Sequence, residues 1–352
     1  MSRLMLCGAI SWLVLSSSAT IRGDDAEDKA AAFLEKLGGQ ITRDEKLPGK
    51  PVISVGLAVS TVNQNGLREL TKLKSLTSLN MDGIKVTYAG VLEIAALKTL
   101  THLSLNFTDV TDSGLKELAK KLTSLTTLEM RGTKVTDAGL KELAILTNLT
   151  TLEMGHTKVT DVGLKELAIL TNLVQLRLDG TNVTDAGLKE LAPLTQLRQL
   201  HLGGPNLTDA GLKELATLTN LTELNVSRAK VTVGALNDLQ AALPKCMIRA
   251  VGTEDKNLIG RWELANPKKG DTMYVYEFSE KGKFTIVNES GDEREGTYTL
   301  NGTKIDITIP KSIIRDYKGT WAITKLTDDE FVFKGFSNNA KEETWKKIKP
   351  KK

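Results

Sequence analysis

Histidine is a common metal ligand, and this chain has three histidines. His102 and His201 both fall at outward-facing positions of predicted strands that lie four units apart in a repeating sequence, roughly 19 Å along a stack of parallel strands. His156 falls at the exit of a strand between them. Zinc ligands must converge to about 2 Å from one ion. The spacing therefore predicts no metal site, and no other residue set predicts a cofactor.

Acid–base or nucleophilic chemistry would also need side chains that converge on one point. Most repeats carry a Lys-Glu pair within the segment L-K-E-L, but such regular recurrence is typical of the solvated face of a short helix. No G-x-S-x-G nucleophile turn occurs, and the recurring glycines stand singly rather than in a phosphate-binding loop. We therefore predict a protein that is not an enzyme.

Polar residues recur on the outward side of the predicted strands. These positions vary from repeat to repeat while the leucines do not, which is typical of a recognition surface, although unconstrained positions would drift in the same way. The outward columns contain no Trp, Tyr or Phe, the residues that dominate tight interfaces, so we expect a polar partner and modest affinity. The candidate contacts are Glu129, Arg131, Glu153, Arg177, Asp179 and His201.

The elements that position these residues come from one 24-residue unit, seen best in 149–172, LTTLEMGHTKVTDVGLKELAILTN. Its first half ends in strand-like alternation, and its second half places apolar residues at i, i+3 and i+4, as on one face of a helix. Thr160 or Asp161 can cap this helix. Neither element can bury its apolar face alone, so copies must stack on one another.

A glycine marks the register of the copies. Because glycine costs roughly 1 kcal/mol against alanine inside a helix, its recurrence predicts a close approach of the helix start to the neighbouring unit. An eighth, divergent unit follows at 221–246, and the repeats together occupy about 48–252. The glycines stand at Gly66, Gly90, Gly114, Gly139, Gly163, Gly187 and Gly211.

The consensus L-x-x-L-x-L-x-x-T-x-V-T-D-x-G-L-K-E-L resembles the leucine-rich repeat in its ribonuclease-inhibitor-like form. It is most similar to the arrays of exported proteins from planctomycete-type bacteria. The resemblance implies an α/β solenoid, an arc with parallel strands on its concave face and short helices on its convex face. Thr133, Thr157 and Thr181 stand where Asn or Cys is usual, and their hydroxyls can still bond the turning backbone.

The first residues predict export. Arg3, the mostly apolar run Leu4–Leu15 and the small residues Ser17–Ala19 match the three parts of a signal peptide, assigned to 1–22. The apolar run is shorter than the roughly 20 residues that span a bilayer, and no other stretch is apolar enough for a transmembrane segment. We expect a periplasmic, secreted or cell-surface protein; an uncleaved, buried helix is the alternative.

Residues 24–47 predict a helical cap on the first repeat. Acidic residues crowd the start of Asp24–Leu37, where the helix dipole favours them, and Gly38-Gly39 ends the helix. A solenoid needs such a cap because its terminal repeat would otherwise expose its apolar side.

The composition changes after residue 256, where 12 of the 16 aromatic residues lie. Period-two runs such as Tyr274–Phe278, and a hairpin signal at Asn301-Gly302, predict about eight strands within 256–349. Gly260-Arg261-Trp262, together with the segments GTYTLNG and GTWAITKL, resembles the G-x-W signature of lipocalin-like domains. The resemblance implies a small antiparallel all-β barrel.

Two functions are consistent with these features. The first is an exported, non-enzymatic protein–protein interaction scaffold with an unknown partner on the concave face. The second is a small apolar ligand held in the barrel between Trp262, Tyr276, Phe278 and Trp321, although a barrel of this size can also be filled by its own side chains. A net charge of only +4 gives no basis for a nucleic-acid partner.

Overall fold

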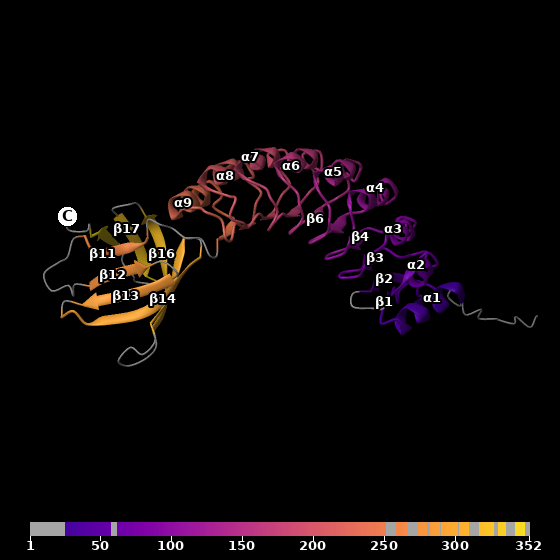
Figure 1. Ribbon diagram of the computed structural model, residues 1–352, viewed down its shortest axis with the longest axis horizontal. Coiled ribbons are helices and arrows are strands. Elements are labelled where there is room, and N and C mark those ends of the chain that lie inside the picture. Colours follow the sequence, from indigo (N-terminus) through magenta and orange to yellow (C-terminus); the bar gives the residue numbers. More distant parts are fainter. Residues whose placement is uncertain are drawn as a thin grey trace, which may run out of the picture.

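The computed structural model describes residues 25–57, 62–250, 258–265, 274–279, 282–288, 290–301, 303–309, 317–326, 330–335 and 342–348. They form an arc of stacked repeats followed by a small barrel at its C-terminal end (Figure 1). The predicted fold, a parallel repeat sheet with helices and then an eight-stranded antiparallel barrel, is confirmed. The predicted signal peptide lies outside the described residues. Within them, no helix is both long and apolar enough to cross a membrane.

A curved sheet of short strands lines the inner side of the arc (Figure 1). From β3 to β9 the middle residue of each strand is a buried leucine, and its two neighbours face the concave side, as the alternation of a strand requires. The strands pair in parallel in chain order. They are β2 (Val52–Gly56), β3 (Ser78–Asn80), β4 (His102–Ser104), β5 (Thr127–Glu129), β6 (Thr151–Glu153), β7 (Gln175–Arg177), β8 (Gln199–His201), β9 (Glu223–Asn225) and β10 (Met247–Arg249).

Short helices cover the outer side of the arc (Figure 1). Thr160 caps α6, as predicted, because its hydroxyl accepts the backbone N–H of Val162 at 3.2 Å. The helices are α2 (Gln64–Leu70), α3 (Tyr88–Ala95), α4 (Asp112–Lys121), α5 (Asp137–Leu140), α6 (Asp161–Leu167), α7 (Asp185–Leu188), α8 (Asp209–Glu214) and α9 (Val233–Ala242). Short 3-10 turns continue three of them at η1 (Lys141–Ile145), η2 (Lys189–Leu191) and η3 (Leu215–Thr217).

Asp161, the first residue of α6, bonds the next repeat rather than its own helix. Its carboxylate accepts the backbone N–H of Thr184 at 2.8 Å and the Thr184 hydroxyl at 2.7 Å. A threonine that caps its own helix therefore also ties that helix to the preceding repeat, and we call this series the Asp–Thr ladder. The same two bonds join Asp112 to Thr136, Asp137 to Thr160, Asp185 to Thr208, and Asp209 to Thr232.

The recurring glycine leaves room for the ladder carboxylate. A β-carbon at Gly139 would lie 2.5 Å from Asp112 Oδ1, and one at Gly187 would meet the carboxylate of Asp161 more closely still. The predicted close approach to the neighbouring unit is therefore confirmed for these repeats. The threonines at the usual Asn position also bond the backbone, as predicted: Thr157 Oγ1 donates to the carbonyl of Met154 at 2.7 Å.

The first repeat is covered by helix α1 (Asp25–Lys36), which buries Ala30, Ala31 and Leu34 against it. A strand that the sequence did not predict, β1 (Gln40–Arg43), pairs antiparallel with β2 and closes that edge of the sheet. No residue of β1 is fully buried, so the strand lacks the alternating apolar pattern that would predict it.

Eight antiparallel strands form the closed barrel, in which β18 pairs with β11. Its interior is packed with aromatic rings, with Trp262, Phe278, Phe284 and Phe331 almost fully buried. Its likeness to lipocalin-like domains stays a prediction. The strands are β11 (Gly260–Leu264), β12 (Tyr274–Ser279), β13 (Lys283–Asn288), β14 (Glu293–Asn301), β15 (Lys304–Ile309), β16 (Tyr317–Leu326), β17 (Glu330–Gly335) and β18 (Glu342–Lys347).

The barrel packs directly on the last repeat. Val233, the first residue of α9, is fully buried within the apolar cluster of the barrel rather than that of the repeats. Asn237 Nδ2 of the same helix donates to the backbone carbonyl of Thr324 in β16 at 3.4 Å. Val233 occupies the position at which Asp161 and its equivalents stand in earlier repeats.

Candidate functional site

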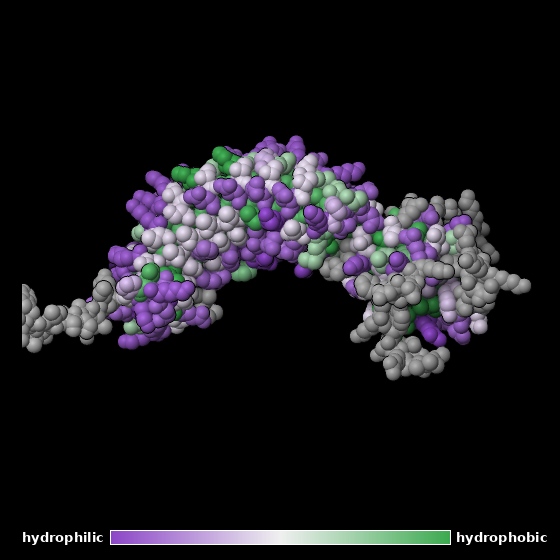
Figure 2. All heavy atoms as spheres, turned by 180° about the vertical axis from the view of Figure 1, so that it is seen from behind, coloured by the Kyte–Doolittle hydropathy of each residue, from purple (hydrophilic) through white to green (hydrophobic). Residues whose placement is uncertain are grey.

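The concave sheet places charged side chains in one continuous row. Because β5, β6, β7 and β8 pair in register, Glu129, Glu153, Arg177 and His201 stand side by side on neighbouring strands. Arg131 and Asp179 follow two residues after the corresponding row positions of β5 and β7. Seen from behind, hydrophilic residues gather along the middle of the inner edge of the arc (Figure 2).

Arg131 reaches across a whole repeat to an acidic partner. Its Nη1 lies 3.3 Å from Asp179 Oδ2, two repeats away, and 3.7 Å from Glu153 Oε1. Gly155 stands between Arg131 and Asp179 in the same column and offers no side chain to block this path. A β-carbon there would lie 3.0 Å from the carbonyl oxygen of Asp179. The glycine therefore opens the face at its centre and permits the long ion pair.

Glu153 is the centre of the charged group, between two arginines. Its Oε2 lies 3.8 Å from Arg177 Nη1, and only 13 % of its side chain is exposed. Burial raises the pKa of Glu153 above its ordinary value; Glu129 adds to the rise, and Arg177 and Arg131 oppose it. The guanidinium groups of Arg131 and Arg177 therefore hold the Glu153 carboxylate in place, while its burial disfavours the charged form.

Glu129 extends the group toward the N-terminal repeats through hydrogen bonds. Its Oε2 lies 3.0 Å from Ser104 Oγ and accepts from Asn106 Nδ2 at 3.1 Å. Ser104 Oγ also lies 2.5 Å from Asp82 Oδ1, which in turn accepts the backbone N–H of Asn106 at 2.9 Å. Asn106 Oδ1 accepts the backbone N–H of Arg131 at 2.8 Å, so Asn106 links Glu129 to the arginine. Five of the six predicted residues thus belong to one connected set, which we call the concave charge network: Glu129, Arg131, Glu153, Arg177 and Asp179.

His201 adjoins this network in register but pairs elsewhere. Its Nε2 lies 3.8 Å from Glu223 Oε1, which also faces Arg249 at 3.9 Å. Burial lowers the pKa of His201 below its ordinary value, and the positive charge of Arg177 lowers it further against the opposing effect of Glu223. The lowered pKa favours the neutral imidazole of His201.

Two ring side chains at the edge of the face were not among the predicted contacts, although His156 was placed at the exit of its strand. Phe107 and His156 sit in left-handed backbone, with φ of 56° at each, in a turn where other repeats place glycine. Each ring covers the glycine of the next repeat, since a β-carbon at Gly132 or Gly180 would lie 2.7 or 2.6 Å from it. We expected no aromatic residue on the concave face. Phe107 lies at the border of that face with 62 % of its surface exposed, so the expectation holds only for the columns considered.

A signal for these rings was present in the sequence. From Gly83 to Gly180 the turn column alternates glycine with large residues, in the order Gly83, Phe107, Gly132, His156 and Gly180, and the last two repeats follow with Gly204 and Arg228. Alternation lets each large ring lie over a residue that has no side chain. The columns considered from the sequence ended one position earlier, and so left this pattern out.

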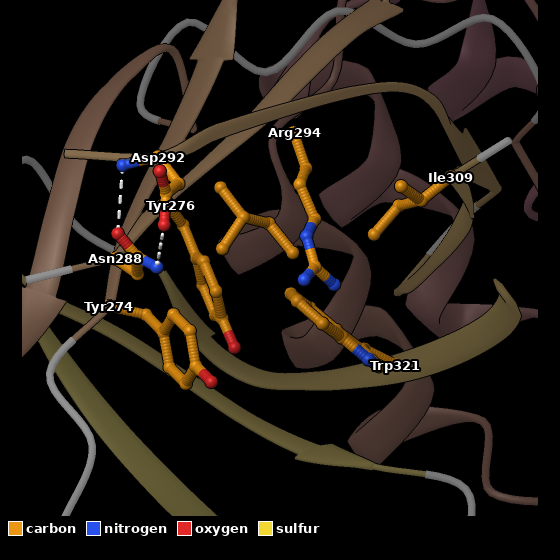
Figure 3. Close-up of a pocket in the computed structure, with 8 residues that line it drawn as sticks. Tyr274, Tyr276, Asn288, Asp292, Arg294, Ile309 and Trp321 are labelled. Carbon is orange, nitrogen blue, oxygen red and sulfur yellow. Dashed lines mark hydrogen bonds between the residues drawn. The ribbon is translucent and has the colours of Figure 1, made fainter. Parts of the chain in front are cut away.

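The barrel separates the four residues predicted to hold an apolar ligand. Trp262 and Phe278 pack against Phe331 in the buried core, with ring centroids 5.6 and 5.9 Å from it. Tyr276 and Trp321 line a cavity of about 280 Å³ in another part of the interior (Figure 3). The structure therefore divides the predicted set into two core residues and two cavity residues.

The histidines lie where the strand pattern predicted. His102 is the first residue of β4 and His201 the last of β8, while His156 follows β6 and lies 3.7 Å from Asp179 through its Nε2. Among the residues that the structure describes, no group of three or more His, Cys, Asp or Glu side chains is placed to hold a metal ion.

Comparison with known proteins supports the repeat fold. The family described as "Leucine Rich repeat" matches residues 96–119, 121–144, 146–168 and 170–192. No curated protein sequence matches the chain.

Two solved structures from Listeria monocytogenes str. 4b F2365 are similar to this chain. An internalin (inlF) is 25 % identical with a TM-score of 0.43, over 52 % of this chain and 56 % of its own, so the match spans little more than half of that internalin. An internalin C2 (inlC2) is 22 % identical with a TM-score of 0.46, over 65 % of this chain and 93 % of its own. The chain thus carries a leucine-rich repeat domain, followed by an eight-stranded antiparallel barrel.

Proposed function

We propose that this chain is an exported, non-enzymatic binding protein that recognises a polar protein partner on the concave face of its repeats. The observation that carries the proposal is the concave charge network, in which four charged side chains are positioned by ion pairs and Glu129 by hydrogen bonds to Ser104 and Asn106. Such side chains lose less conformational freedom on binding than mobile ones do, so more of the contact energy appears as affinity.

The charges of the network indicate which charges a complementary partner surface carries. The network holds three carboxylates and two guanidinium groups, with Glu129 and Glu153 adjacent on neighbouring strands, so the complementary surface carries both signs as well. Arg131 and Arg177 keep donors in addition to those facing Glu153, since each guanidinium has five N–H groups. Phe107 supplies an exposed aromatic contact at the border, of the kind enriched in energetically dominant positions of interfaces.

Export rests on the first residues of the sequence. The basic residue Arg3, the apolar run Leu4–Leu15 and the small residues that follow are the parts of a signal peptide. N-terminal sequencing of the protein recovered outside the cytoplasm tests this part separately. Recovery of the chain with Met1 still attached and only in the cytoplasm would contradict it.

The test of concave-face recognition is a pair of charge reversals that leave the net charge unchanged. We expect Glu153→Lys with Arg177→Glu to abolish capture of the partner from the exported protein fraction, because the two charges at the centre of the network change sign. Binding is compared with wild type by quantitative mass spectrometry of the retained proteins.

The matched control reverses two neighbouring charges on the outer side of the arc, Lys165→Glu with Glu166→Lys in α6. This control keeps its partner if the proposal holds. Equal capture by wild type and by both double variants, all with wild-type unfolding temperatures, would contradict recognition by the concave face.

A further inference from the structure

The barrel cavity lies at the end of the barrel that faces away from the repeats. Tyr274 begins β12, Asn288 ends β13 and Ile309 ends β15, and all three line the cavity of about 280 Å³. Thr324, which bonds α9, lies toward the opposite end of β16. Between the cavity and α9 the interior is filled by the packed aromatic core. The cavity is therefore short, near the lower end of the roughly 300–1,000 Å³ of ligand sites.

Aromatic rings that are fixed from behind form one wall of this cavity. Tyr276 stacks on Trp345 with centroids 4.1 Å apart, and Trp321 stacks on Phe333 with centroids 4.3 Å apart. Tyr276 and Trp321 themselves lie 5.2 Å apart and tilted by 33°. Because their partners fix their orientation, these rings offer a preformed flat surface to a bound molecule.

Arg294 places an exposed cation beside these rings. It stands in the same interior row as Tyr276 and Ile286, which pair in register across β12, β13 and β14. Its guanidinium points toward Trp321 (Figure 3). Within the part of the chain that the structure describes, its side chain makes no hydrogen bond and no carboxylate lies within 4.0 Å of it.

The nearby carboxylate of Asp292 is already engaged. Asp292 Oδ2 accepts from Asn288 Nδ2 at 2.9 Å, and Asn288 Oδ1 accepts the backbone N–H of Asp292 at 2.8 Å (Figure 3). The two residues thereby close the β13–β14 turn on each other. Arg294 is the cationic group of the cavity, exposed and without a protein acceptor for its five N–H donors among the described residues.

We propose that this cavity binds a small anion with a flat apolar body, an aromatic carboxylate. The ring lies against Tyr276 and Trp321, and the carboxylate accepts two parallel hydrogen bonds from Arg294, the geometry that a guanidinium fork favours. The packed core beneath the cavity excludes a long acyl chain. The site is independent of the concave face, and it replaces the predicted neutral apolar ligand by a charged one.

The experiment titrates the full chain with naphthalene-2-carboxylate by isothermal calorimetry. Naphthalene-2-carboxamide and naphthalen-2-ylmethylammonium serve as neutral and cationic probes of similar shape. We expect the carboxylate to bind more tightly than either, and Arg294→Gln to weaken its binding by at least about tenfold while leaving the carboxamide unchanged. Arg261→Gln is the control, since Arg261 faces outward beside Glu277 at 3.8 Å; it leaves all three affinities unchanged.

Three results would overturn the proposal. One is a carboxylate affinity that Arg294→Gln leaves intact, which would place the probe elsewhere. Another is tighter binding of the ammonium probe, which would assign the cavity to Asp292. The third is carboxylate binding weaker than about 1 mM, since a preformed aromatic and cationic site must exceed that affinity. Unfolding temperatures of both variants, measured alongside, show that the barrel stays folded.

Discussion

Left-handed backbone costs a residue with a side chain roughly 1–2 kcal/mol, yet the turn column adopts it at Phe107, His156 and Arg228. Strain of this kind persists where a side chain is needed at that place. Sequence reasoning found the outward columns of the face because a strand alternates. It could not find the long Arg131–Asp179 contact, which depends on the curvature that brings alternate repeats together over Gly155.

Phe107→Gly tests whether the strained ring serves binding rather than stability. We expect the variant to unfold at the wild-type temperature or slightly above it, because release of the left-handed strain offsets the packing lost from a largely exposed ring. Partner capture should weaken at the same time. A clear fall in unfolding temperature with capture unchanged would assign Phe107 a structural role. Thermal unfolding by circular dichroism is the measurement.

His201 gives a prediction about pH. Because its folded pKa is below the ordinary 6.5, the unfolded chain binds more protons in the window beneath pH 6.5. The free energy of unfolding therefore falls as the pH drops from 6.5 through the lowered pKa. In an NMR titration we expect the His201 midpoint below that of an unfolded chain, and closer to it in Arg177→Gln. A midpoint above 6.5 would contradict the role of burial.

At the scale of elements, the Asp–Thr ladder explains why helix, turn and glycine recur together. The sequence predicted strand, helix, cap and a close approach at the glycine, because each depends on local spacing. It did not show which atom occupies the space, since both Thr160 and Asp161 suit the capping position. Only the stacked structure shows that the two residues have different partners. The threonine caps its own helix, and the aspartate accepts hydrogen bonds from the threonine of the next repeat.

A double-mutant cycle at Asp161 and Gly187 measures this arrangement. We expect Gly187→Ala to destabilise by about 1–3 kcal/mol, because the new methyl group meets the Asp161 carboxylate. In an Asp161→Ala background the same change should cost at least about 1 kcal/mol less, since the carboxylate is gone and only the Cα of residue 161, at 3.1 Å, remains close. Gly204→Ala is the control, because its β-carbon would meet no atom within 4 Å. Additive effects in urea unfolding would contradict the proposed coupling.

For the whole molecule, the barrel takes the place of the next repeat. The Asp–Thr ladder ends at Asp209, and the equivalent position in the last repeat is Val233, which has no further threonine to bond and packs into the barrel instead. The sequence predicted both domains, because each has its own periodicity. Neither periodicity predicted β1 or the contact between the two domains. Contacts between distant segments leave no periodic signal, as Asn237 and Thr324 illustrate.

Val233→Asp isolates this contact between domains. An aspartate suits the first turn of α9, as it does in five earlier repeats, so the helix should be preserved while a charge enters the buried contact. We expect small-angle scattering to show a larger radius of gyration with circular dichroism unchanged. Val162→Asp, at an exposed position of α6, should behave as wild type. Scattering identical to that of the wild type would contradict the claim that Val233 holds the barrel against the last repeat.

The central claim, recognition by the concave face, is tested most directly by carbodiimide labelling of carboxylates with and without the captured partner. We expect protection of Glu129, Glu153 and Asp179 in the complex, while Glu166 on the convex side and Glu277 on the barrel keep their labelling. Protection confined to Glu166 or Glu277, with the concave carboxylates labelled as in the free chain, would contradict it.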